Sequence, residues 1–364
     1  MKKLLPEVCT IQYGFPFDSA KFSDSNGMPL IRIRDVVRGY SETYTTEEYK
    51  SEYIVHENDL LIGMDGEFNI AKWGKTPALL NQRVCRLAPK DSIDKDYLFY
   101  FMPIALKRIE EKTPFVTVKH LSAKELNKIE IPVLSLEEQR KIAETLSKVD
   151  KLIAFREQQL AKLDELVKAR FVEMFGDEQA FNKEPLSQNV EEMFIGPFGS
   201  SLKNENFVSK ENGYCMVYEQ KHAIRKTMDV ETRYIDKPKY EELKRFSIHG
   251  GDIIVSCRGT IGETYIVPLN APLGIMHPSI MKIRVKDSIY DRVFFDFLLQ
   301  EKLKQHEAQA NGSGVKMAVT ASALGKEEFI VPSIPFQNQF AAFVERVDQQ
   351  KQTVQQSLEK LELM

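Results

Sequence analysis

One segment decides the fold of this chain, because it occurs twice. Residues 56–66 read HENDLLIGMDG, and residues 249–259 read HGGDIIVSCRG. The histidine, the aspartate, the run of three aliphatic residues and the final glycine stand in step in the two copies. Short aliphatic runs next to Gly, Asn and Asp predict buried strands. Repetition at this distance predicts two related units in one chain.

Flanking segments repeat in the same order. Upstream, GFPFDS at residues 14–19 resembles GPFGSS at residues 196–201. Downstream, YLFYF at residues 97–101 resembles VFFDF at residues 293–297. The repeat therefore covers each half of the chain and is more than one shared motif.

Each half has a mixed secondary-structure pattern before its last segment. Residues 60–62, 253–255 and 280–285 predict strands, and residues 96–111 predict a helix. The predicted fold class is therefore α+β.

Each half ends in a helical segment whose apolar residues recur at alternating spacings of three and four. This spacing is typical of a coiled-coil seam, so we expect the helices to pair antiparallel about a pseudo-twofold axis. Two separate amphipathic helices are the alternative. Arg156 and Lys351 interrupt the seam and are predicted to specify its register. The expected helix-pairing residues are Ile142, Leu146, Val149, Ile153, Leu160 and Leu163, then Phe340, Val344, Val347, Val354, Leu358 and Leu361.

The polar stretch at residues 176–185 ends the first helical segment and begins the second globule. We therefore predict four parts in the order globule, helix, globule, helix. Their expected limits are residues 1–135, 136–178, 179–334 and 335–364.

Composition excludes several classes of protein. The net charge is −3, so attraction to nucleic acid must come from local clusters of Lys and Arg. The four cysteines form no Cys-x-x-Cys pair, which predicts free thiols and no zinc ribbon. Without a long apolar run or a signal-peptide pattern, we expect a cytoplasmic protein that does not enter membranes.

Catalytic motifs are also missing. The segment KTPF at residues 112–115 lacks the polar residue and second proline of an amino-methyltransferase motif. GKT at residues 74–76 lacks the first glycine of a phosphate-binding loop, and the histidines form no His-Glu-x-x-His pattern. Asp59 and Asp252 open the repeated strands and are predicted to form turns. No catalytic or metal-binding residue is expected.

The loops after the repeated strands combine cations with amide side chains. Lys and Arg suit DNA phosphates, whereas Arg suits guanine and Asn or Gln suit adenine. A solvated surface charge is the alternative for any single Lys or Arg. In the first half, the candidate DNA-binding residues are Arg32 and Arg34 on a strand, then Glu67, Asn69, Lys72, Trp73, Asn81, Gln82, Arg83 and Lys119. In the second half they are Lys203, Lys221, His222, Arg258, Thr260, Lys282 and Lys316.

Several motifs in a fixed order resemble one known family, the specificity subunits of type I restriction-modification enzymes. They are GFPF at 14–17, PLIRIRD at 29–35, GMDGEFN at 63–69, LNQRV at 80–84, EEQRKIA at 137–143 and QNQFAAFV at 337–344. The resemblance covers nearly the whole chain. One departure is that Met364 aligns with Leu166, whereas the first helical segment continues to about residue 175. This departure concerns the distal partner-docking surface and not the DNA reading.

The resemblance implies a non-catalytic subunit in which two target recognition domains, held by an antiparallel helical spacer, read a split DNA site. It also implies two modification subunits as partners and, through them, restriction subunits. Any S-adenosylmethionine, ATP and magnesium would be bound by those partners. Two other classes stay open, namely a coiled-coil scaffold that does not read DNA and a self-sufficient DNA-modifying enzyme.

Overall fold

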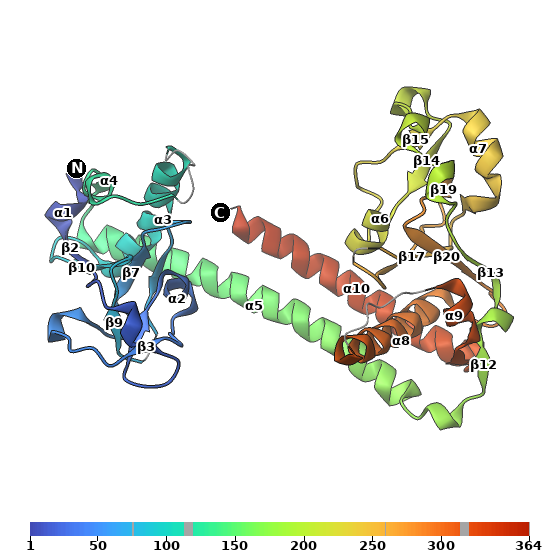
Figure 1. The fold of residues 1–364 in the computed structure, drawn as a ribbon, viewed down its shortest axis with the longest axis horizontal. Helices are drawn as coiled ribbons and strands as arrows, with labels where there is room; N and C mark the ends of the chain where they lie inside the picture. The colour runs from blue at the N-terminus through green and yellow to red at the C-terminus, as the bar shows by residue number, and fades with distance from the viewer. Residues whose placement is uncertain (75, 113–118, 259, 314–319, 364) are drawn as a thin grey trace. The chain divides into compact units, whose positions relative to one another are not determined.

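The computed structural model describes residues 1–74, 76–112, 119–258, 260–313 and 320–363. The chain divides into two units, Met1–Phe155 and Arg156–Met364 (Figure 1). This division falls inside a long helix and does not test the predicted four-part limits, which stay a prediction.

A four-stranded antiparallel sheet lies at the centre of the first unit, in the order β2-β10-β7-β8. Its strands are β2 (Cys9–Tyr13), β7 (Leu60–Gly63), β8 (Ile70–Lys72) and β10 (Val84–Pro89). The repeated aliphatic run forms β7. Leu60 and Ile62 enter one core together with Leu98 of α3 (Lys95–Lys112), whereas Leu61 enters a second core with Trp73. Alternate side chains thus meet opposite cores, which explains why this strand is apolar at every position.

The second core lies under a five-stranded sheet in the order β3-β5-β4-β9-β6. Its strands are β3 (Phe22–Ser23), β4 (Met28–Ile31), β5 (Tyr44–Thr45), β6 (Ile54–Val55) and β9 (Ala78–Leu80). β4 and β9 run parallel, and the short helix α2 (Ile33–Arg38) follows β4. The two parallel strands therefore end at the same edge of the sheet.

The second unit repeats this topology without a strand equivalent to β3, with sheets in the orders β13-β20-β17-β18 and β15-β14-β19-β16. Its strands are β13 (Val190–Ile195), β14 (Cys215–Tyr218), β15 (Tyr234–Ile235), β16 (Ser247–Ile248), β17 (Ile253–Ser256), β18 (Thr264–Ile266), β19 (Gly274–Met276) and β20 (Ile280–Val285). Ile253 and Val255 enter one core, and Ile254 enters another. β14 and β19 are again parallel. The predicted internal repeat and α+β class are confirmed.

The smaller elements also correspond. β1 (Lys2–Leu4) pairs with β11 (Glu130–Pro132), and β12 (Lys183–Pro185) pairs with β21 (Glu328–Ile330). The remaining shorter helices are α1 (Leu5–Val8), α4 (Ala123–Asn127), α6 (Gln220–Arg225), α7 (Lys237–Leu243), α8 (Arg292–Ser313) and α9 (Ala321–Lys326). Short 3-10 turns lie at Ser19–Lys21, Ser51–Tyr53, Glu178–Ala180, Leu186–Gln188, Gly199–Ser201, Asn204–Asn206, Lys210–Asn212 and Lys244–Phe246.

Equivalent caps align α3 with α8. The Asp94 carboxylate accepts a hydrogen bond from the backbone N–H of Tyr97, and the Asp291 carboxylate accepts one from that of Phe294. Tyr97 therefore corresponds to Phe294. The predicted alignment of residues 97–101 with 293–297 is wrong by one residue, because several neighbouring aromatic residues make both alignments plausible from sequence.

The helices α5 (Leu136–Phe175) and α10 (Ile334–Glu362) are the longest in the described part of the chain. In the second unit, Asp164 forms an ion pair with Lys351 at 2.6 Å, and the rings of Phe175 and Phe336 lie 5.1 Å apart. Residue numbers fall along α5 as they rise along α10, so the helices pair antiparallel here. Lys351, which interrupts the seam, thus bridges the two helices.

Among the described residues, no helix combines the length and the apolar composition that a membrane span needs.

Most predicted pairing residues in the second unit contribute to this packing. Phe340 and Val347 lie in the core, and Leu163 and Val344 pack against it. Val354 and Leu358 are buried, whereas Leu160 and Leu361 are half-buried. In the first unit, Leu146, Val149 and Ile153 are half-buried, and Ile142 is 38% exposed while its neighbour Ala143 enters the core. Pairing by these first-unit residues stays a prediction.

A buried glutamine in the first turn of each long helix connects that helix to its unit by hydrogen bonds. The Gln139 side chain accepts a hydrogen bond from the backbone N–H of Asp94 and donates one to the carbonyl of Leu134. Gln337 does the same with Asp291 and Pro332. These bonds satisfy the amide in both units, which explains its place in the EEQRKIA and QNQFAAFV motifs.

The four cysteines are free, as predicted. Cys9, Cys85 and Cys215 are buried, and Cys257 is half-buried. Burial raises the pKa of the Cys9 and Cys85 thiols to about 12 each, so they stay protonated and pack as small apolar groups.

Candidate nucleic-acid interface

The parallel strand pairs bring two loops together in each unit. In the first unit, Ile31 lies beside Leu80, so Arg32 and Asn81 follow the strands at one edge. In the second unit, Tyr218 lies beside Met276, so the corresponding residues are Glu219 and His277. The backbone N–H of His277 donates to the carbonyl of Tyr218 at 2.9 Å.

The loop after the repeated strand joins this edge as a third segment. The backbone N–H of Met64 donates to the carbonyl of Arg83, and that of Cys257 donates to the carbonyl of Ser279. A methyl group added at Gly63 would lie 3.2 Å from the side chain of Ile33, which shows how closely α2 covers β7. Each unit thus gathers three loops, which follow β4, β7 and β9 in one unit and β14, β17 and β19 in the other.

A fourth loop lies against this edge in each unit, because a glycine lets its backbone approach closely. A methyl group at Gly14 would lie 2.0 Å from the carbonyl oxygen of Asn81, and one at Gly196 would lie 2.3 Å from that of His277. No larger residue fits at either position without moving the backbone, which explains the shared glycine of GFPF and GPFG. Two residues beyond Gly196, Phe198 is 86% exposed. Phe198 is a further candidate for this surface that is not among the residues predicted from the sequence, where it only marks the repeat. Its place in a polar, glycine-flanked loop is the signal that could have marked it.

In the first unit, Asp65 contacts residues of two other segments. Its carboxylate lies 2.5 Å from Nδ1 of His120 and 3.5 Å from Nε of Arg83. Gly66 also donates its backbone N–H to the carbonyl of Lys119. Around this centre, the predicted residues Arg32, Arg34, Glu67, Asn69, Gln82 and Arg83 are exposed, and Asn81 is half-buried.

In the second unit, Glu219 takes the central place. It forms ion pairs with Arg233 and with Lys221, the latter at 2.9 Å. Burial alone would raise the pKa of the Glu219 carboxyl, but hydrogen bonds from these cations outweigh it and hold the pKa below its ordinary value. Arg258 and Thr260 are exposed in the neighbouring loop. Lys203 is also exposed, 3.9 Å from Glu205.

Three predicted DNA-binding residues lie in the interior and are removed from the candidate set. Trp73 is 2% exposed and donates its indole N–H to the carbonyl of Thr76. His222 is fully buried, and burial lowers its pKa. Lys282 is 1% exposed, with its ammonium 2.5 Å from Glu192 and 2.9 Å from the carbonyl of Ser247. None of these side chains can reach a base.

Other predicted positions are altered or fall outside the description. Arg32 and Arg34 do not lie on a strand, because Arg32 caps α2 and Arg34 is inside it. Lys72 is half-buried and paired with Asp96 at 2.8 Å, and Lys119 lies 3.5 Å from Glu110. These two cations are therefore already partly neutralised. Lys316 lies outside the described residues.

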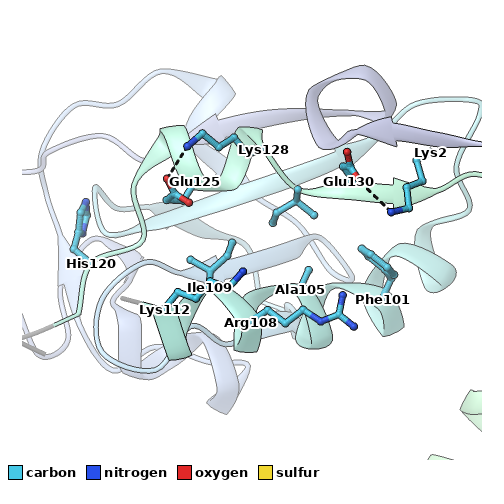
Figure 2. Close-up of a pocket in the computed structure, with 11 residues that line it drawn as sticks. Lys2, Phe101, Ala105, Arg108, Ile109, Lys112, His120, Glu125, Lys128 and Glu130 are labelled. Carbon is cyan, nitrogen blue, oxygen red and sulfur yellow. Dashed lines mark hydrogen bonds and ion pairs between the residues drawn. The ribbon is translucent and has the colours of Figure 1, made fainter. Parts of the chain in front are cut away.

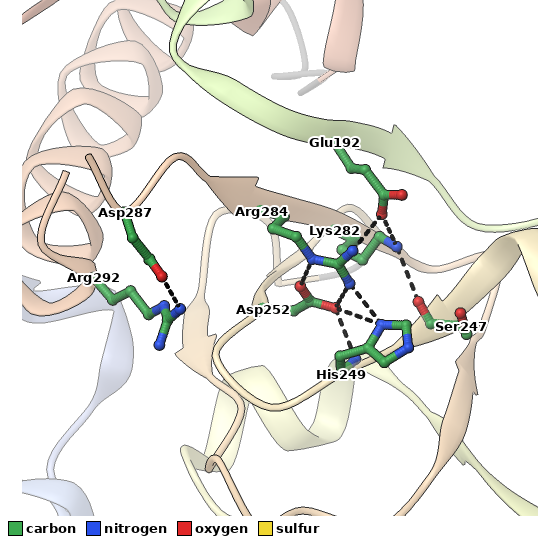
Figure 3. A network of polar contacts seen from close by, with 8 residues as sticks. All are labelled: Glu192, Ser247, His249, Asp252, Lys282, Arg284, Asp287 and Arg292. Atoms are coloured by element: carbon green, nitrogen blue, oxygen red, sulfur yellow. Dashed lines mark hydrogen bonds and ion pairs between the residues drawn. The ribbon is translucent and has the colours of Figure 1, made fainter. Parts of the chain in front are cut away.

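An Asp–Arg ion pair occurs in both units, at the start of the repeated strand that leads into the loops. In the first unit, Asp59 binds Arg86 at 3.0 Å. In the second unit, Asp252 binds Arg284 at 2.7 Å (Figure 3). Each aspartate also accepts the backbone N–H of the histidine three residues earlier, which confirms the predicted turn-forming role. Neither arginine is among the residues predicted from the sequence. They lie on corresponding strands but not at corresponding positions, because Arg86 of β10 lies opposite Leu61 whereas Lys282 of β20 lies opposite the equivalent Ile254. No shared sequence position therefore marks the two arginines.

The arrangement offers hydrogen-bonding and cationic side chains on loops rather than a set of reacting groups. The described residues contain no cluster of three or more His, Cys, Asp or Glu side chains that could hold a metal ion. Exposed Arg, Asn and Gln side chains on rigidly held loops are the groups that read base edges and phosphates. The geometry thus defines a binding protein with two similar sets of loops, one in each unit.

The comparisons with known proteins identify its family. A model described as the type I restriction modification DNA specificity domain matches residues 1–165 and again residues 200–363. The chain therefore belongs to this family.

Named relatives agree. The EcoBI specificity subunit of a type I restriction enzyme from Escherichia coli is 40% identical over 164 residues, which make up 44% of this chain and 34% of that protein. The match thus spans about a third of that relative's length. The MjaVIII specificity subunit from Methanocaldococcus jannaschii is 22% identical over 313 residues, or 77% of this chain and 72% of that one.

Two solved structures share the fold. One is the S subunit of a type I restriction-modification system from M. genitalium, with a TM-score of 0.58, and it aligns with all of this chain and 93% of its own. The other comes from a study of complex assembly and conformational transition of the type I R-M system, with a TM-score of 0.65, and it aligns with all of this chain and 94% of its own. Both are 16% identical to this chain, so the likeness concerns the fold.

Proposed function

We propose that this chain is the DNA-specificity subunit of a type I restriction-modification complex and is not itself catalytic. Each unit reads one part of a bipartite DNA site, and the two parts differ in sequence. The observation that carries this proposal is the same set of three loops in both units, filled with different side chains.

The two sets of side chains have different reading chemistry. The first unit presents Asn69, Gln82 and Arg83, which suit adenine and guanine. The second presents Arg258 and Thr260, which suit guanine and less specific contacts. Because the groups differ at equivalent places, the site is expected to be asymmetric. Exposed cations outside the central contacts, such as Lys203, would position the phosphates.

Partner subunits would supply the chemistry. We propose two modification subunits that bind S-adenosylmethionine, and restriction subunits that use ATP and magnesium, all acting in the cytoplasm. Exposed large apolar side chains on α5 support a role of this helix in docking, since such residues often mark protein interfaces. The most exposed of them are Leu152, Phe155, Leu166 and Val172.

Methylation mapping of a genome that carries the chain with its modification subunits tests the reading role. We expect methylated adenines in one bipartite, asymmetric sequence, and loss of that methylation when the chain is deleted. A perfect palindrome would contradict the difference between the units. Gel shifts with the assembled complex provide the second measurement, and failure of the complex to bind any DNA would support a scaffold instead.

A further inference from the structure

A groove with a volume of about 720 Å³ lies on the first unit, between α3, α4 and the β1-β11 pair (Figure 2). It begins at His120, which also contacts Asp65 of the candidate interface, and follows one face of α3. This volume lies within the range of about 300–1,000 Å³ that is usual for ligand sites. Neither the reading loops nor the long helices account for it.

The floor of the groove is an apolar stripe. Phe101, Ala105 and Ile109 stand four residues apart on α3, so they share one face, and Ile129 adds to the floor from the segment between α4 and β11. The stripe runs for about 12 Å at about 1.5 Å per residue. The small Ala105 at its centre leaves room for a side chain from an occupant. This pattern is that of a groove that accepts the apolar face of a helix.

The rim of the groove carries net positive charge. Its two acids are already neutralised, because Glu125 pairs with Lys128 at 3.1 Å and Glu130 pairs with Lys2 at 3.1 Å (Figure 2). Arg108 is exposed beside them and, like the exposed Lys112 one turn further on, forms no ion pair with another described residue. An occupant should therefore bring acidic groups at the spacing of one helical turn.

The second unit does not repeat this surface. Since Tyr97 corresponds to Phe294, Ala105 corresponds to Lys302 and Arg108 corresponds to Gln305. A lysine replaces the small residue at the centre of the floor, and a neutral amide replaces the rim cation. The groove is thus a property of one unit and not of the shared scaffold.

We propose that this groove binds an acidic amphipathic helix from another protein subunit of the same complex, one helix for each copy of the chain. The DNA backbone would match the rim charge, but it offers no apolar ridge for the stripe of Phe101, Ala105 and Ile109. The proposal rests on the proposed function in one respect, namely that a multisubunit complex forms.

Site-specific photocrosslinking identifies the occupant. The full chain, with p-benzoylphenylalanine in place of Lys112, is assembled with its modification and restriction subunits and irradiated in the presence of DNA. We expect mass spectrometry to find one protein segment in which Asp or Glu flanks an apolar stripe. The same replacement at Gln305, which is the counterpart of Arg108 on α8, should not capture that segment. Crosslinks to DNA alone, or none at all, would overturn the proposal.

Charge reversal measures the contribution of the rim. The double variant Arg108→Glu with Lys112→Glu should weaken binding of the captured subunit by about tenfold or more, because like charges then face each other. Changing the acids of the captured segment to lysine should restore binding. Lys107→Glu is the matched control, since Lys107 is exposed on the same helix but does not line the groove. An unchanged thermal midpoint separates this effect from unfolding.

The outcomes separate this proposal from the proposed function. If the wild-type complex selects its DNA site but the double variant binds every subunit normally, only the groove proposal fails. Normal subunit binding with weaker, less salt-dependent DNA binding would assign the groove to phosphates and refute the helix. If the wild-type complex selects no site, the proposed function fails whatever the variants do.

Discussion

The two units share their sheets and several buried contacts but differ in the loops that follow the strands. Asp59 and Asp252 each bind an arginine of the neighbouring strand, and Gly14 and Gly196 pack against equivalent carbonyls. In both units a buried glutamine connects a long helix to its unit by hydrogen bonds. Beyond these points, Asp65 stands where the other unit has Arg258. Similar interiors with different loops let one architecture hold two surfaces of different composition, as the proposed reading of two different half-sites requires.

The comparison also separates residues that support from residues that read. A supporting residue is at least half-buried and pairs with the same type of residue in both units, whereas a proposed reading residue is exposed and changes between them.

Removing the buried support of the second unit should have the largest effect. Asp252→Ala leaves Arg284 without its main partner, and Asp252 is only 1% exposed, so we expect a loss of about 3–5 kcal/mol in the stability of that unit. Asp59→Ala should cost about 1–2 kcal/mol, because its pair with Arg86 is more exposed. Hydrogen exchange of β17 and β20 against β7 and β10 measures both losses. Equal losses would show that burial does not distinguish the two supports.

A reading residue should alter specificity without altering stability. Arg258→Ala is expected to cost about 1–3 kcal/mol of binding free energy and to relax only one part of the site. Arg83→Ala is the matched change and should relax only the other part. Gel shifts across a panel of singly altered sites provide the measurement. Uniform weakening at every sequence would instead mark Arg258 as a phosphate contact.

The exposed ring of Phe198 tests whether the loop after β13 belongs to the reading surface. Phe198→Ala should leave the free energy of unfolding within about 0.5 kcal/mol, because the side chain is 86% exposed. We expect it to weaken DNA binding by about 1–2 kcal/mol, the size of burying such a ring at an interface. Leu269→Ala is the control, since Leu269 is 78% exposed in a different loop of the same unit. Equal DNA affinity of the two variants and the wild type would remove Phe198 from the surface.

Mild acid should weaken the second unit through His222, which is buried, and His277, which is half-buried. Burial holds the pKa of His222 and His277 below the ordinary value, so the unfolded chain binds these protons first as pH falls. Their contribution to stability is present above about pH 6.5 and falls by up to about 1.4 kcal/mol per pH unit for each histidine below it. Thermal unfolding at pH 7.5 and pH 5.5 measures the change. The double variant His222→Gln with His277→Gln should show a smaller difference; an unchanged difference would assign the acid sensitivity to other groups.

Much of the fold could be predicted from local sequence. The strand at residues 280–285 was predicted at its full length, because its apolar run is bounded by turn residues on both sides. The helix predicted at residues 96–111 is found at Lys95–Lys112. The residues of the candidate site are harder to predict from the sequence. Three of its predicted members are buried, namely Trp73 after β8, His222 in α6 and Lys282 in β20. Their burial depends on elements that pack against them and are distant in sequence.

The sequence by itself determined the internal repeat, the order of elements, the helical seam and the family, because these depend on residue spacing that a linear pattern preserves. Only the tertiary structure decided which polar residues are buried among partners and which are exposed on the loops. Lys282 is a core residue because Glu192 and Ser247 surround its ammonium, and Arg83 reaches the surface beside Asp65 because two loops end at one sheet edge. Whether a charge is buried depends on the partner that neutralises it, and those partners meet only when the sheets form.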